Sequence, residues 1–425
     1  MDTIFALATA QGRAGVGIVR LSGPDAHAVA ARYAGPLPDT RRAVRRPLRD
    51  ERGDVLDDIL LLTFGTGASF TGEDVAEFHL HGSIAITNAV LALLARTEGC
   101  RLAEAGEFTR RALENGCMDL VEVEGLADLI DAETDAQRRQ AMQVYSGGLS
   151  SRTEGWRDDL IRAAALVEAT IDFADEEIPE NVFPEVEEIV AHLTTEFQRE
   201  AAGVAQAERL RSGFEVALIG PPNAGKSTLL NAIARRDVAI TSDIAGTTRD
   251  VLELRTDING LPVTFLDTAG IRETSDTVER IGVSRARQRA EAADLRIFLE
   301  AIADLEARGD DIRLLAKSDI RTGDGFPISA KTGAGVAALL DKVGQILQGR
   351  LQNVGAATHL RHQIALSTAA EYLLAAQEDL VDAELRAELA AQNIRGAISV
   401  LDTLVGRIGV EDLLGEIFSS FCIGK

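Results

Sequence analysis

The stretch Phe214–Ile233 reads FEVALIGPPNAGKSTLLNAI and holds the spacing G-x-x-x-x-G-K-S from Gly220 to Ser227. An apolar run precedes the glycines and a helical pattern follows them, which is the context that a phosphate-binding P-loop requires. In such a loop, backbone N–H groups surround phosphate oxygens, Lys226 adds a positive charge at the β and γ phosphates, and Ser227 offers a hydroxyl to Mg²⁺. A glycine-rich turn that binds nothing needs neither side chain. The stretch therefore predicts an α/β nucleotide-binding domain.

A second pattern follows in VLELRTDINGLPVTFLDTAG, Val251 to Gly270. Two apolar runs flank Asn259-Gly260, the strongest short signal for a β-hairpin. The second run ends in DTAG, where Asp267 is expected to hold Mg²⁺ through water. P-loop, hairpin and DxxG in this order resemble the GTPase superfamily. By that resemblance AGTTRD is the first switch, with Thr248 as a second Mg²⁺ ligand.

The base of the nucleotide is expected to meet LLAKSD, Leu314 to Asp319, and the Ser-Ala-Lys run of PISAKTGAG. Asp319 can accept both the ring N–H and the exocyclic amine of guanine, a pairing that adenine does not supply. The N–H of Ala330 can meet the guanine carbonyl, and the stem of Lys317 can cover the ring. Ala316 stands where these GTPases carry Asn, a loss of about 0.5–1.5 kcal/mol per hydrogen bond. We predict weakened GTP binding with guanine preference retained.

The residues predicted to bind the nucleotide lie in the P-loop, the first switch, the DxxG motif and the two base loops. They are Asn223, Ala224, Gly225, Lys226, Ser227, Thr228, Ser242, Asp243, Ile244, Ala245, Gly246, Thr247, Thr248, Asp267, Thr268, Ala269, Gly270, Lys317, Asp319, Ser329, Ala330 and Lys331.

Along the chain, segments with mixed strand and helix patterns alternate with segments that have only helical patterns. Residues 1–118 mix strand-like and helical runs in one α+β domain, and residues 119–211 are rich in Ala and Glu with helical spacing. Alternation of strands and helices returns in 212–348, and 349–425 is helical again. The fold class predicted is a multidomain α/β and α protein in which a Ras-like P-loop GTPase domain is inserted into a discontinuous helical bundle.

Composition limits the possible partners and the compartment. The 425 residues carry 67 acids against 44 bases, a net charge of −23, which opposes non-specific binding to nucleic acid. An RNA partner must use a local patch such as TRRAVRRPLR, which is also compatible with a solvated loop, or arrive on another protein.

An acid at Asp2 and no apolar segment of about 18 residues argue against a signal peptide and a membrane span, so a cytoplasmic protein is expected. Cys100, Cys117 and Cys422 are too scattered for a disulfide framework.

The group that activates water for hydrolysis is not evident from the P-loop and DxxG motifs. Ile271 stands where Ras-like GTPases carry a water-orienting Gln, and an apolar side chain cannot orient water. The acids and arginines of IRETSDTVERIG, residues 271–282, include Glu279, although most of them fit a solvated loop equally well.

Motifs along nearly the whole chain resemble the MnmE (TrmE) family of tRNA-modification GTPases. They are ALATAQGRAGVGIVRLSG, SFTGEDVAEFHLHG, AGEFTRRALENG, DFADEEIPE, GPPNAGKSTLLNAI, DIAGTTRD, DTAGIRETSDTVERIG and FSSFCIGK. The resemblance implies that Glu279 is the general base through a bridging water. It also implies that K⁺, held by Asn223, Ser242, Ile244 and Thr247 across a dimer of GTPase domains, replaces an arginine finger.

The N-terminal run EDVAEFHLH places Glu77, His79 and His81 on one face of a strand. This set could bind zinc or iron, but a solvated polar face is the commoner meaning. The resemblance implies a third use, a folate-binding and dimerisation domain. In it Arg20, Glu77 and the C-terminal Lys425 hold a tetrahydrofolate one-carbon donor, in the 5-formyl or methylene form.

Two cysteines bear on that resemblance. Cys117 stands in NGCMDL where the family commonly has Lys, which removes one expected folate contact. Cys422 is the candidate reactive thiol, although a small apolar tail residue is an equally good interpretation.

By this resemblance, the chain hydrolyses GTP and, with an FAD-containing partner of the MnmG (GidA) family, modifies C5 of the wobble uridine of tRNAs with an aminomethyl-type group. The alternative from another class is a regulatory GTP switch in ribosome assembly, which would need neither folate nor Lys425.

Overall fold

The structure is a computed structural model that describes residues 2–172, 182–221, 223–236, 253–267, 288–300, 308–351 and 355–408, with Phe418, Phe421 and Gly424. Two compact units are present, residues 1–127 with 402–425, and residues 128–401. Within the described ranges, no helix combines the length and the apolar character needed to cross a membrane.

The first unit is built on a six-stranded sheet with the order β3-β4-β5-β2-β1-β6, antiparallel except for the β1–β6 pair. Its elements are β1 (Thr3–Leu7), β2 (Val16–Ser22), α1 (Ala26–Ala34), β3 (Val44–Arg49), β4 (Val55–Phe64), β5 (Val75–His81), α2 (Ile84–Ala95), β6 (Cys100–Leu102) and α3 (Glu107–Glu114). Alternation along β5 buries Phe78 and Leu80 with residues of α1 and α2, so the polar residues between them take the other face.

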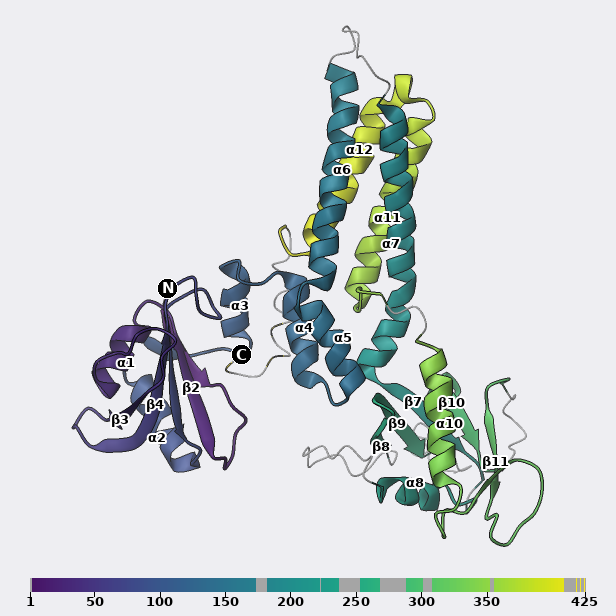
Figure 1. The fold of residues 1–425 in the computed structure, drawn as a ribbon, viewed down its shortest axis with the longest axis horizontal. Coiled ribbons are helices and arrows are strands. Elements are labelled where there is room, and N and C mark those ends of the chain that lie inside the picture. The colour runs from purple at the N-terminus through teal and green to yellow at the C-terminus, as the bar shows by residue number, and fades with distance from the viewer. Residues whose placement is uncertain are drawn as a thin grey trace, which may run out of the picture. The chain divides into compact units, whose positions relative to one another are not determined.

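Long helices make up the first and last parts of the second unit. They are α5 (Asp135–Tyr145), α6 (Gly148–Asp172), α7 (Phe183–Ser212), α11 (Leu360–Leu380) and α12 (Ala383–Leu404). Helix α4 (Leu120–Asp131) has only its last four residues in this unit, and α12 ends three residues beyond it. Val186, Val190, Leu193 and Phe197 recur every three or four residues on α7 and are fully buried. Helices α7 and α11 pack side by side, as Figure 1 shows.

A second six-stranded sheet lies between α7 and α11 in the sequence, with the order β12-β11-β10-β7-β9-β8. Its elements are β7 (Phe214–Ile219), α8 (Lys226–Ala234), β8 (Glu253–Ile258), β9 (Leu261–Asp267), β10 (Leu295–Phe298), β11 (Ile312–Ala316), β12 (Phe326–Ile328) and α10 (Val336–Gly349). All neighbouring strands are parallel except β8 and β9. The carboxyl ends of the parallel strands therefore meet at one edge, where α/β sheets bind ligands.

The predicted hairpin is confirmed. Strands β8 and β9 pair antiparallel, with Ile258 opposite Leu261. Asn259 and Gly260 between them have φ of 54° and 83°. A two-residue turn with both φ positive matches the right-handed twist of its strands, which explains why the sequence places Asn and Gly there.

Candidate nucleotide-binding site

The phosphate loop connects the carboxyl end of β7 to the first residue of α8. Gly225 caps the helix with φ of 105°, and Asn223 has φ of 66°. A side chain is strained in that left-handed region, so the sharp turn requires Gly at 225 and tolerates Asn at 223. The turn exposes the N-terminus of α8, whose N–H groups and dipole favour an anion.

Lys226 is buried in this turn and is 5% exposed. Its Nζ donates to the carbonyl oxygens of Gly220, at 2.6 Å, and Pro221, at 3.1 Å. The ammonium group is therefore fixed beside the helix N-terminus, and phosphate oxygens can be received there by a preformed positive charge.

Ser227 and Asp267 meet although they are 40 positions apart. The Ser227 hydroxyl donates to Asp267 Oδ2 at 2.7 Å. The pairing follows from the fold, because β7 and β9 are parallel neighbours with Leu218 opposite Asp267. A hydroxyl and a carboxylate are hard oxygen ligands that suit Mg²⁺, so the described donor set fits the predicted ion.

The two base loops emerge from β11 and β12, which are parallel neighbours with Ala316 opposite Ile328. The Ser318 N–H donates to the Ile328 carbonyl at 3.0 Å and ties the loops together. Between these loops and the P-loop lies a cavity of about 220 Å³. It is lined by Ala224, Gly225, Thr228, Leu229, Leu299, Ala316, Lys317, Asp319, Ile320, Ile328, Ser329, Ala330 and Lys331.

The cavity thus brings together base-loop and P-loop residues that the sequence predicted separately. Lys317 is held with φ of 59°, and Ser329 is 1% exposed, its Oγ accepting the Thr332 N–H at 3.3 Å. The predicted contacts Ser242 to Thr248, Thr268, Ala269, Gly270 and Glu279 lie outside the described residues, as do Cys422 and Lys425.

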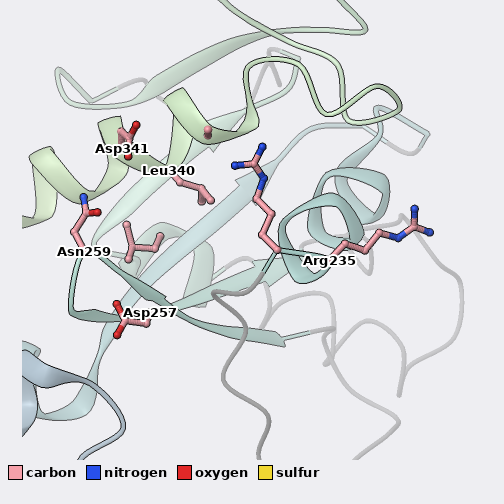
Figure 2. Close-up of a pocket in the computed structure, with 8 residues that line it drawn as sticks. Arg235, Asp257, Asn259, Leu340 and Asp341 are labelled. Atoms are coloured by element: carbon pink, nitrogen blue, oxygen red, sulfur yellow. The ribbon is translucent and has the colours of Figure 1, made fainter.

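A larger cavity, of about 320 Å³, opens on the same sheet but was not predicted (Figure 2). It is lined by Arg235, Arg236, Asp257, Ile258, Asn259, Ala337, Leu340 and Asp341. These residues come from the end of α8, the β8–β9 hairpin and α10. Their charges are mixed, and apart from the turn residue Asn259 they belong to no motif, so only the tertiary fold reveals the cavity.

In the first unit, Arg20 and Glu77 form an ion pair, with Arg20 Nε 2.9 Å from Glu77 Oε1. They lie opposite each other on β2 and β5. His79 Nε2 is 3.1 Å from the other Glu77 oxygen. Burial raises the pKa of the Glu77 carboxyl, but the hydrogen bonds from His79 and Arg20 and the arginine charge outweigh it, so the pKa is lowered.

The three polar residues predicted on this face do not converge. His81 Nδ1 lies 2.7 Å from Asp57 Oδ1 and so contacts a different carboxylate from His79. Over the described part of the chain, no three side chains of the metal-binding types gather. Cys100 and Cys117 are free thiols.

The sheet, the phosphate loop and the Asp319 cavity define the class: a P-loop GTPase, with the Ser227–Asp267 pair placed for a metal ion. Two family models match the chain, the MnmE helical domain over residues 120–422 and the GTP-binding protein TrmE N-terminus over residues 3–117. The chain belongs to the MnmE (TrmE) family of tRNA modification GTPases.

Curated relatives match the chain over its whole length and support the same family. The tRNA modification GTPases MnmE of Roseobacter denitrificans (strain ATCC 33942 / OCh 114) and Cereibacter sphaeroides (strain ATCC 17029 / ATH 2.4.9) are each 56% identical, over 428 and 429 residues, covering 100% of both chains. Among solved structures, Aquifex aeolicus Era is 30% identical and covers 32% of this chain and 56% of its own, with a TM-score of 0.24. That score is too low to add to the assignment.

Proposed function

We propose that this chain is a cytoplasmic, K⁺-dependent GTPase that supports modification of the wobble uridine of tRNAs. One observation carries the proposal: the Ser227 hydroxyl and the Asp267 carboxylate meet beside the buried Lys226, at the sheet edge that also holds the cavity of Asp319. The relatives, which are tRNA modification GTPases, support the same reaction class.

The described residues have distinct roles in this proposal. Ser227 would hold Mg²⁺ directly and Asp267 would hold it through water, and Thr248, which lies outside the described residues, would be the second direct ligand. Lys226 stabilises negative charge that develops on the β and γ phosphates. Asp319 and the Ala330 N–H read guanine, and the missing Asn at position 316 weakens GTP binding without removing the preference for guanine.

The family resemblance supports the remaining parts of the hydrolytic site. K⁺ would be held by Asn223 with Ser242, Ile244 and Thr247, and would supply the positive charge that an arginine finger supplies elsewhere. Glu279 would act as the general base through a water molecule. Two copies of the chain would bring their GTPase domains together.

Initial hydrolysis rates with GTP and ATP, each in K⁺ and in Na⁺, test the cation and the base together. We expect GTP to be hydrolysed in K⁺ at least about tenfold faster than in Na⁺, because a fixed cation stabilises the charge of the transition state. ATP should be hydrolysed poorly in both salts. Equal rates for the two nucleotides would contradict guanine recognition, and equal rates in the two salts would contradict the K⁺ site.

The tRNA half of the proposal involves the first unit and a partner. An FAD-containing protein of the MnmG family would act together with this chain, a tetrahydrofolate derivative would donate the one-carbon unit, and glycine or ammonium would complete the group. Glu77 would accept hydrogen bonds from the donor-rich pterin ring, while Arg20 and Lys425 supply positive charge. The carboxylate of Glu77 is held in place by Arg20, whose Nε is 2.9 Å from Oε1, and the arginine charge helps to lower the pKa of the carboxyl.

Glu77→Gln is expected to lower the affinity for 5-formyltetrahydrofolate by at least about tenfold, because a hydrogen bond to a charged group is worth about 1.5–3 kcal/mol. It should also abolish modification of unmodified tRNA when GTP, the MnmG-family partner, folate and glycine are supplied. Glu98→Gln, the same change at an exposed position of the same unit, is the control. Thermal unfolding without folate separates lost binding from lost folding. A folded Glu77→Gln protein that binds folate normally would contradict this role.

A further inference from the structure

The wall of the base cavity at the end of β11 is the methyl group of Ala316. This residue is 8% exposed and packs in one apolar cluster with Ala224 and Ile328. A methyl group neither donates nor accepts a hydrogen bond. The part of a bound purine that faces this wall is therefore not read by a side chain of β11 or by Ala224.

Guanine has more polar groups than the described cavity has inward-facing partners. Its N1–H and amino group are donors, and its O6 and N7, side by side on the other edge, are acceptors. Asp319 accepts from the two donors and the Ala330 N–H reaches O6 in the proposed mode of binding. The acceptor N7 is then left for the remaining lining residues.

The remaining lining residues provide few donors for the acceptor N7. Ser329 is 1% exposed, so its hydroxyl presents almost no surface to a ligand in the cavity. In the proposed mode of binding the stem of Lys317 covers the ring face, and Thr228 and Lys331 are exposed residues. Apolar groups make up the inner wall.

We infer that this chain does not read N7 of the purine and that Ala316 determines this specificity. 7-Deazaguanosine triphosphate, in which a C–H replaces N7, is bound as tightly as GTP. The inference rests on the proposed binding of GTP and concerns which guanine atoms are recognised. The nucleotide is selected through O6, N1 and the 2-amino group alone.

Equilibrium binding of GTP and 7-deazaguanosine triphosphate, with Mg²⁺, to the full chain tests this inference. The wild-type protein should bind the two with the same affinity, within about twofold, because no neutral hydrogen bond is lost. Ala316→Asn restores an amide and should favour GTP by about 2- to 13-fold, the range expected for one such bond. Ala316→Val, an apolar change at the same buried position, is the matched control and should leave the ratio near one.

The ratio of affinities is the readout, because a larger side chain at a buried position can weaken both nucleotides equally. A wild-type protein that prefers GTP more than fivefold would overturn the inference, since another donor or a bound water would then read N7. A folded Ala316→Asn protein with an unchanged ratio would overturn the assignment to position 316. Failure of the wild-type protein to bind either nucleotide would overturn the proposed function itself, together with the inference.

Discussion

Asp319→Asn is expected to weaken GTP binding by at least about a hundredfold and to make the protein prefer xanthosine triphosphate. The carboxylate of Asp319 offers two acceptors to the two donors of guanine, whereas an amide offers one acceptor and one donor group. The amide NH₂ would oppose the 2-amino group of guanine. Xanthine has a carbonyl oxygen at that position and pairs with the same amide.

The measurement is an equilibrium titration of the wild-type and variant proteins with GTP and xanthosine triphosphate. Asp341→Asn is the matched control, because Asp341 is exposed, lines the other cavity of the same sheet (Figure 2) and undergoes the same loss of charge. Its GTP affinity should not change. An Asp319→Asn protein that keeps its preference for GTP would show that another group reads guanine.

Lys226→Ala is expected to lower the rate of GTP hydrolysis by about 10²- to 10³-fold, the usual effect of removing one preorganised donor to a developing charge. The Nζ atom is fixed by the carbonyls of Gly220 and Pro221, at 2.6 and 3.1 Å, so its charge is in place before the nucleotide arrives. Alanine removes that charge from the phosphates. It also leaves both loop carbonyls without their lysine partner.

Single-turnover hydrolysis at saturating GTP measures the chemical step, and a separate titration measures binding. Lys342→Ala is the control, because Lys342 is an exposed lysine of α10 whose Nζ lies 5.7 Å from the centre of the Phe326 ring. Circular dichroism establishes that the variants fold. Hydrolysis by Lys226→Ala within tenfold of the wild-type rate would remove this lysine from the proposed mechanism.

The parts of the site that local rules govern could be predicted from the sequence. A strand, a glycine turn and a helix identify the P-loop within the stretch Phe214–Ile233. The Asn259-Gly260 turn is equally local, because only residues that tolerate positive φ make that hairpin. Ser227 and Asp267 were each predicted to hold Mg²⁺ from their own motif, and the parallel pairing of β7 with β9 is what brings the two side chains together.

Contacts set by strand register or by long-range packing could not be predicted in this way. The Arg20–Glu77 bond joins residues 57 positions apart and depends on which residues of β2 and β5 face each other. The Leu120 N–H donates to the Val405 carbonyl at 3.1 Å, which helps to join the first part of α4 to the first compact unit. Composition changes near residue 119 and gives no sign of this partner. The cavity beside Asn259 similarly requires three elements to be assembled.

The packing of α7 against α11 has a consequence for synthesis on the ribosome. Val186, Val190 and Phe197 on α7 emerge about 180–195 residues before α11 is complete at Leu380, a delay of roughly 9–39 s at ordinary translation rates. During that delay the apolar face of α7 lacks this partner, while the sheet that follows it has time to form its own core. The domain between α7 and α11 is thus expected to fold first. Once folded, it connects α7 to α11 through a compact body instead of a long unfolded chain.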